Sequence, residues 1–149
     1  MRHWNRTVDE SGHGAVEFAL GVGLLLLPVA ILVLGFGPWS ERRVVAEAAA
    51  AEAARAAVIT LDAGAGEVVV AEMGANHGLE ADQVLLGWCG SEPTPVSESR
   101  SGCSLARGSV VEAEVRIWVP LVQTPWGPIG NVWASGRHAE PIDLYRSLG

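Results

Sequence analysis

The segment Ala15–Gly37, AVEFALGVGLLLLPVAILVLGFG, decides the fold of this chain. From Ala19 to Phe36 it contains no charged and no strongly polar side chain. At a rise of about 1.5 Å per residue, a helix of this length crosses a hydrocarbon core of about 30 Å. The sequence therefore predicts one transmembrane helix near the N-terminus, to which we assign residues 13–37.

Two residues of the apolar segment are unusual for a membrane helix. Glu17 is ionisable and lies just inside the N-terminal edge, where a carboxylate costs less than the ~2.5 kcal/mol or more expected at the bilayer centre. Two interpretations stay open: Glu17 lies among lipid headgroups, or it faces a partner other than lipid. Pro28 lies mid-helix and removes a backbone hydrogen bond, which predicts a kink.

The composition limits the function classes. The chain has 149 residues and a formal net charge of −7, which leaves room beyond the apolar helix for one small domain and argues against nucleic acid. The sequence shows no catalytic Ser/His/Asp arrangement, no Gly-rich phosphate loop and no G-x-S-x-G motif. His77 has no second metal-ligating residue near it. We therefore predict no enzyme activity, cofactor, metal site or small-molecule substrate.

A second helical stretch follows the apolar segment. From Ser40 to Leu61 the residues favour helix at nearly every position, and Glu52 and Arg55 are spaced to form an i,i+3 pair. The charges fall around the whole helical wheel, which excludes a second membrane span and predicts no clean amphipathic stripe. We expect residues 38–61 to form an Ala-coated stalk. The stalk either packs against another helix or remains a solvated spacer.

Residues 62–149 predict a small α+β domain. The segment DAGAG (62–66) predicts a chain break, and EVVVAEMGANHG (67–78) a short second helix. Apolar residues alternate with polar ones in 84–88 and 111–119, which predicts antiparallel strands with one buried face. Pro120 is expected to end the second of these strands. A weaker third strand is expected at 131–140, after a Pro- and Gly-rich connection.

Cys89 and Cys103 are the only cysteines, and they bracket a polar loop at residues 90–102. A zinc site would need two further ligands, and a redox site would need a C-x-x-C motif. A structural disulfide closing a loop of ~15 residues would contribute roughly 3 kcal/mol in the chain-entropy model. Such a bond is typical of an oxidising compartment, so it favours a location outside the cytoplasm.

The heptapeptide GHGAVEF begins at Gly12, where the polar N-terminus meets the apolar segment. It resembles the processing site of prepilin peptidases: a glycine, four residues, then a glutamate and an aromatic residue directly before an apolar helix. The resemblance implies cleavage after Gly12, which makes residues 1–12 a cytoplasmic leader and His13 the first residue of the mature chain. It also implies that Glu17 and Phe18 act in subunit assembly. Glu17 would neutralise the new α-amino group of a neighbouring subunit in a dry environment.

The longer segment from Gly12 to Thr60 resembles the N-terminal half of the TadE-like pseudopilins. The shared features are the VEFAL start, a proline within the helix, a GFG-like exit and the Ala-rich pattern AxEAARAA. The C-terminal residues PIDLYRSLG are similar to those of actinobacterial members.

The resemblance implies a minor pilin or pseudopilin of a Tad (tight adherence, Flp-type) pilus or secretion system with a type IV pilin-like α+β fold. A long N-terminal helix would lead to a three-stranded antiparallel sheet. The chain would cross the cytoplasmic membrane once, with the N-terminus inside and residues 62–149 outside, or enter a cell-surface filament. Its partners would be the membrane, the prepilin peptidase, other Tad pilins or pseudopilins, and assembly proteins. Filament component, priming subunit and assembly factor all remain open. A second hypothesis is an uncleaved, membrane-anchored extracytoplasmic binding protein whose 90–102 loop contacts a ligand.

Overall fold

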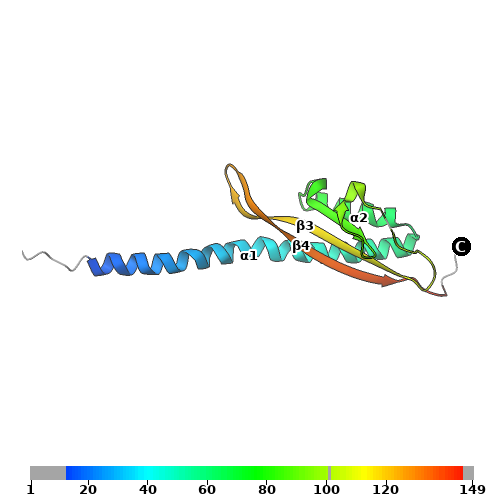
Figure 1. Ribbon diagram of the computed structural model, residues 1–149, viewed down its shortest axis with the longest axis horizontal. Helices are drawn as coiled ribbons and strands as arrows, with labels where there is room; N and C mark the ends of the chain where they lie inside the picture. Colours follow the sequence, from blue (N-terminus) through cyan, green and yellow to red (C-terminus); the bar gives the residue numbers. More distant parts are fainter. Residues whose placement is uncertain (1–12, 101, 146–149) are drawn as a thin grey trace, which may run out of the picture. The chain divides into compact units, whose positions relative to one another are not determined.

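The computed structural model describes residues 13–100 and 102–145 as an α+β protein (Figure 1). The elements in chain order are α1 (His13–Thr60), α2 (Ala63–Asn76), the 3₁₀ helix η2 (Ala81–Gln83), β1 (Val84–Trp88), β2 (Thr94–Pro95), the 3₁₀ helix η3 (Val96–Glu98), β3 (Val110–Thr124) and β4 (Gly127–Pro141). The chain divides into two compact units, of which one ends at Phe36 and the other begins at Gly37.

The first unit contains the apolar part of α1. Its large side chains are exposed, among them Val16, Leu24 at 81% and Leu32 at 70%. By length and composition, α1 is the one helix of the described residues that can cross a membrane. Pro28 lies inside this helix, which continues without interruption to Thr60.

The part of α1 in the second unit buries one stripe almost completely. The stripe consists of small apolar residues: Val45, Ala46, Ala49, Ala50, Ala53, Ala54, Ala57 and Val58. The expectation of no clean stripe was wrong, because alanine contributes little hydrophobicity to a helical wheel yet allows a neighbouring layer to approach closely. Glu52 and Arg55 form the expected ion pair on the exposed side, with 3.0 Å between Arg55 Nη1 and Glu52 Oε1.

A tight reversal joins α1 to α2. Leu61 adopts a left-handed conformation (φ 56°), and the Asp62 N–H donates to the Ala57 carbonyl, as in a Schellman motif. The Asp62 side chain then accepts from the Gly64 N–H and caps α2. The sequence prediction of a break across 62–66 was therefore too long, because Asp62 starts the next helix at Ala63. The predicted second helix itself is present, and His77 is its C-cap.

The sheet has four antiparallel strands in the order β2-β1-β3-β4, not the three that were expected. The additional strand, β2, pairs with β1 through Leu85–Pro95 and Leu86–Thr94. It lies in the loop between the two cysteines and is too short to show any alternation. Its proline is tolerated because β2 is an edge strand.

The hairpin of β3 and β4 is longer than the sequence suggested. Pro120 does not end β3: it pairs with Asn131, and the register continues to Thr124 opposite Gly127. The pairing of β1 with β3 ends at Ile117, so β3 has only one neighbour at Pro120 and tolerates its missing N–H. Most of the expected connection 123–130 is therefore strand.

The inner face of the sheet packs on the alanine stripe of α1. Gly136 in β4 lies so close to the backbone of Ala46 and Glu47 that a Cβ atom would overlap them. At Gly66 in α2, a Cβ would come within 2.7 Å of the Ala53 carbonyl oxygen and 2.6 Å of the Trp88 ring. Glycine at position 136 therefore lets β4 approach α1, and glycine at position 66 lets α1 and α2 meet around Trp88.

Because β4 crosses closely over α1 at Gly136, the addition of a single methyl group at this position should destabilise the fold. Gly136→Ala should lower the free energy of unfolding by about 1–3 kcal/mol, because a backbone neighbour cannot move aside as a side chain can. The measurement is thermal unfolding of the full chain in detergent, followed by tryptophan fluorescence. Gly102→Ala is the matched control, because nothing lies within 4 Å of its Cβ position. Equal melting temperatures for the two variants would show that the backbones of β4 and α1 are not in close contact at Gly136.

Candidate functional site

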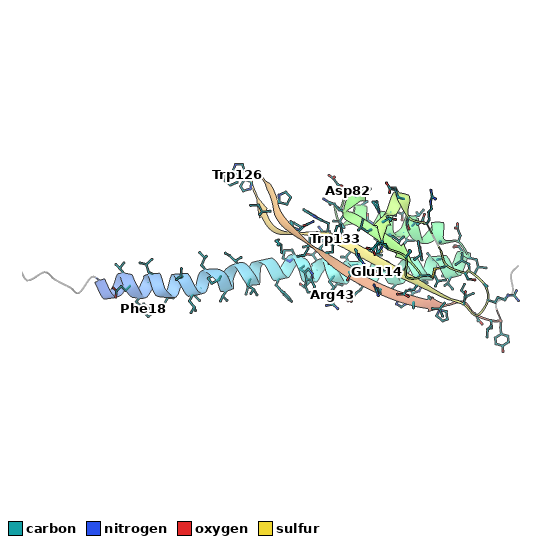
Figure 2. The ribbon with its side chains drawn as sticks, viewed as in Figure 1. Phe18, Arg43, Asp82, Glu114, Trp126 and Trp133 are labelled. Carbon is teal, nitrogen blue, oxygen red and sulfur yellow. A yellow bond between two sulfur atoms is a disulfide. The ribbon has the colours of Figure 1, made fainter. Side chains whose placement is uncertain are left out.

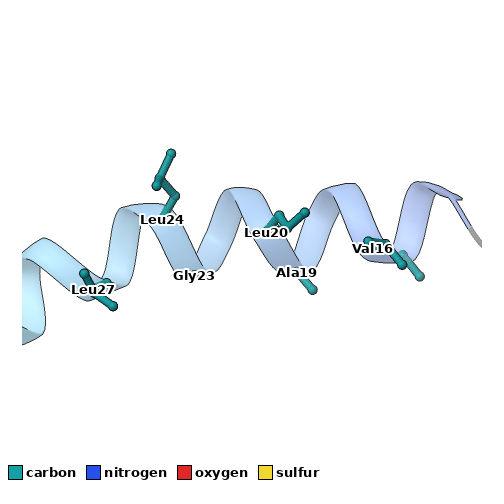
Figure 3. Close-up of a pocket in the computed structure, with 7 residues that line it drawn as sticks. Val16, Ala19, Leu20, Gly23, Leu24 and Leu27 are labelled. Carbon is teal, nitrogen blue, oxygen red and sulfur yellow. The ribbon is translucent and has the colours of Figure 1, made fainter.

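The first candidate site is a shallow hollow along the apolar part of α1 (Figure 3). Small residues repeat every fourth position at Ala15, Ala19 and Gly23, so they lie on one face of the helix. The larger side chains that line the hollow are Val16, Leu20, Leu24 and Leu27. Small residues with apolar neighbours are the usual composition of a helix–helix contact inside a membrane.

The residues expected to act in assembly do not line this hollow. Glu17 and Phe18 are exposed, and at about 100° per residue Glu17 points away from the small residues Ala15, Ala19 and Gly23. The same helical period places Glu17, Gly21 and Pro28 on one side. The processing position Gly12 lies outside the described residues, and His13 is the first residue of α1. The small residues of the hollow and Glu17 therefore lie on different sides of α1.

The second candidate is a ladder of charged side chains on the outer face of the sheet. Glu114 is almost fully buried and binds two arginines, with Oε1 2.8 Å from Arg116 Nε and Oε2 2.6 Å from Arg137 Nη2. Arg116 also binds Glu92, with 2.9 Å from Nη1 to Oε1. The hydrogen bond with Glu114 raises the pKa of Arg116, while burial opposes the change and the charges of both glutamates add to it.

The negative and positive charges of this ladder balance one another. Glu114 lies directly opposite Arg137 in the register of β3 and β4, where opposite charges stabilise a strand pair. Two carboxylates meet two guanidinium groups, so no side chain of the ladder is left with an unbalanced charge for a substrate. The alternation in 111–119 placed Glu114 on the polar face, but the sequence did not show that Arg137 would meet it.

The third candidate is the loop closed by Cys89 and Cys103. The two cysteines form a disulfide, with their Cα atoms 5.5 Å apart. Cys89 has a positive φ of 47° and Gly90 one of 81°, which gives a tight turn closed by the Ser91 N–H and the Trp88 carbonyl. The chain then returns as β2 and η3, with Val96 buried. The disulfide and the pairing of β2 with β1 thus tie the loop to the sheet, and the Val96 side chain faces the core.

Metal-ligating residues do not gather in the described part of the chain: it holds no group of three or more His, Cys, Asp and Glu side chains arranged to bind a metal ion. His77 lies at the end of α2, and its carbonyl accepts a hydrogen bond from Arg42 Nη1 at 3.1 Å. That contact ties the end of α2 to α1. The His138 ring pairs with a second potential metal-ligating side chain, with 3.1 Å between His138 Nε2 and Glu140 Oε2. These two groups alone do not make a metal site.

When the chain is compared with protein-family models, curated proteins and solved structures, none of them matches it. The features that bear on function are therefore the exposed part of α1, the disulfide and the residue pattern GHGAVEF.

The disulfide predicts both a mass and a stability difference. The intact chain should be lighter by two hydrogen atoms before reduction than after it. Reduction should lower the stability by about 3 kcal/mol, because the unfolded chain regains the freedom of the closed loop. Mass spectrometry with alkylation and denaturant unfolding in detergent measure the two effects. Rapid alkylation of both thiols in the unreduced, folded chain would contradict the bond.

Proposed function

We propose that this chain is a TadE-like minor pilin or pseudopilin that acts in the assembly of a Tad-type pilus or secretion apparatus. In this proposal a prepilin peptidase cleaves it after Gly12, the apolar part of α1 anchors it in the cytoplasmic membrane, and the second compact unit lies outside. The chain then leaves the bilayer when its apolar helix exchanges lipid for the helices of neighbouring subunits.

One observation carries the proposal: the apolar surface of α1 is buried in one part of the helix and exposed in the other. From Val45 to Val58 the helix buries its stripe under the sheet of its own chain. From Val16 to Val33 the large apolar side chains are exposed. A subunit of a helical filament needs this division, because its own sheet covers one part of the helix and other subunits must cover the other part.

The disulfide supports the proposed location. A bond between Cys89 and Cys103 persists in the extracytoplasmic space and is rare in the cytoplasm. The second unit would therefore lie outside, and the N-terminus before the apolar segment would lie inside, where prepilin peptidases act. The residue pattern GHGAVEF supplies the substrate for that enzyme.

Processing after Gly12 tests the proposal directly. In cells with the cognate peptidase, membrane-extracted protein should begin at His13, and Gly12→Leu should accumulate as the longer form because a side chain obstructs the protease cleft. Gly21→Leu is the matched control: its Cβ meets nothing within 4 Å, so processing should remain normal. A native chain that begins at Met1 would overturn the proposal and favour an uncleaved, membrane-anchored binding protein.

Glu17 tests the assembly step separately. Glu17→Gln removes the charge that meets a neighbour's α-amino group in a medium of low dielectric, yet it slightly favours insertion into lipid. We expect normal insertion and cleavage, with a clear loss of cross-linked complexes with partner pilins. Glu41→Gln, the same change at an exposed position later in α1, should assemble like the native chain. If Glu17→Gln also assembles normally, Glu17 is only an interfacial residue.

A further inference from the structure

The end of the β3–β4 hairpin is uncharged and apolar, and much of it is exposed. We call residues 120–133 the hairpin tip. No charged residue occurs between Arg116 and Arg137, although 18% of the chain is charged. Trp126 is 93% exposed, and Ile129 (62%), Leu121 (51%) and Trp133 (42%) surround the strand ends. Figure 2 shows Trp126 at the turn of the hairpin. Water is a poor solvent for such a surface, so it indicates a binding partner.

Packing inside the second unit fixes the direction of the hairpin. Gly136, opposite Val115 in the register, lies on Ala46 and Glu47 of α1. Trp88, opposite Ala113, lies near Gly66, whose Cβ position is 2.7 Å from the Ala53 carbonyl oxygen. Residue numbers therefore rise along β3 as they fall along α1. The hairpin tip points toward the Gly37 end of this unit.

Simple lengths show how far the tip reaches. From Val115 to Thr124, β3 rises about 30 Å, whereas α1 covers only about 14 Å from Ala46 back to Gly37. The turn therefore reaches the level of Gly37 even if the strand is inclined by about 60° to the helix axis. Gly37 directly follows the apolar segment in the sequence, so a bilayer crossed by that segment has its surface at this end of the unit.

We propose that the hairpin tip inserts into the headgroup region of the same bilayer that holds the apolar helix. This inference rests on the membrane anchoring of the proposed function, but it requires neither processing nor partner subunits. Trp126 and Trp133 are of the residue type enriched at membrane–water interfaces. The second unit would then meet the membrane at two places, the chain crossing at Gly37 and the hairpin tip.

The charges of the second unit support lipid over a protein partner. Arg116 and Arg137 lie at the base of the uncharged segment and are paired with Glu114, so the charges of the hairpin that lie nearest to its tip remain outside the headgroup region. Beside Gly37, the Arg43 guanidinium stacks on Trp39 at 5.7 Å from the ring centroid. An aromatic ring with a basic group next to it is the usual pattern of a residue at the headgroup level.

Photocross-linking of the full chain tests this inference. The photoreactive residue p-benzoylphenylalanine replaces Trp126, or Tyr145 as the matched control, in protein reconstituted alone into phosphatidylcholine vesicles. Tyr145 is 92% exposed, almost the same as Trp126, but follows β4 at the opposite end of the hairpin. A third variant, at Leu24 in the apolar segment, reports insertion. We expect lipid adducts from positions 24 and 126, with position 126 severalfold above position 145.

The outcomes separate this inference from the proposed function. Lipid adducts at position 24 but none above the control at position 126 would overturn the hairpin contact and leave the membrane anchor intact. Cross-links from position 126 to a second copy of the chain, without lipid adducts, would overturn it in favour of a protein interface. No adduct at position 24 would overturn both the anchor and the hairpin contact. Failure of processing after Gly12 changes none of these readings, because the vesicles contain no peptidase.

Discussion

The close approach of β4 to α1 is the contact on which the second compact unit depends. Gly136 lies against the backbone of Ala46 and Glu47, near one end of a buried stripe of α1 that is mostly alanine. Dispersion attraction is short-ranged, so the backbones of a helix and a sheet attract each other directly only where no large side chain separates them. Trp88, the largest fully buried side chain among the described residues, fills the space where α1, α2 and β1 meet.

This contact also decides what the two faces of the sheet can do. Because the inner face is filled by α1, every second residue of β3 from Val111 to Val119 is buried. The residues between them are left to the outer face, where Glu114 binds Arg116 and Arg137. Beyond Ile117, β3 pairs with β4 alone, and Leu121, Trp126 and Ile129 near the turn are exposed. Its tip is therefore apolar for a reason other than core packing.

Among the described residues, the apolar part of α1 and the hairpin tip are both uncovered in a single chain. Their residue types differ in a way that suits two depths of a membrane. The helix carries leucine, valine and small residues, which suit hydrocarbon and helix contacts, whereas the tip carries tryptophan and proline without charges, which suit the interface. Under the proposed function, both surfaces would contact the bilayer before the chain assembles with other subunits.

The sequence by itself determined the features that depend on local patterns. The apolar run from Ala19 to Phe36, the alternation in 111–119 and the two isolated cysteines each carry their own signal, so the candidate membrane helix, the core strand and the disulfide pair were foreseen. Only the tertiary structure decided the rest. Pro120 stays in a strand because β1 ends before it, the alanine stripe is core because Gly136 lets the sheet approach, and Arg137 meets Glu114 because the register puts them opposite each other. These are contacts between residues far apart in the chain, and no local periodicity encodes which of them will meet.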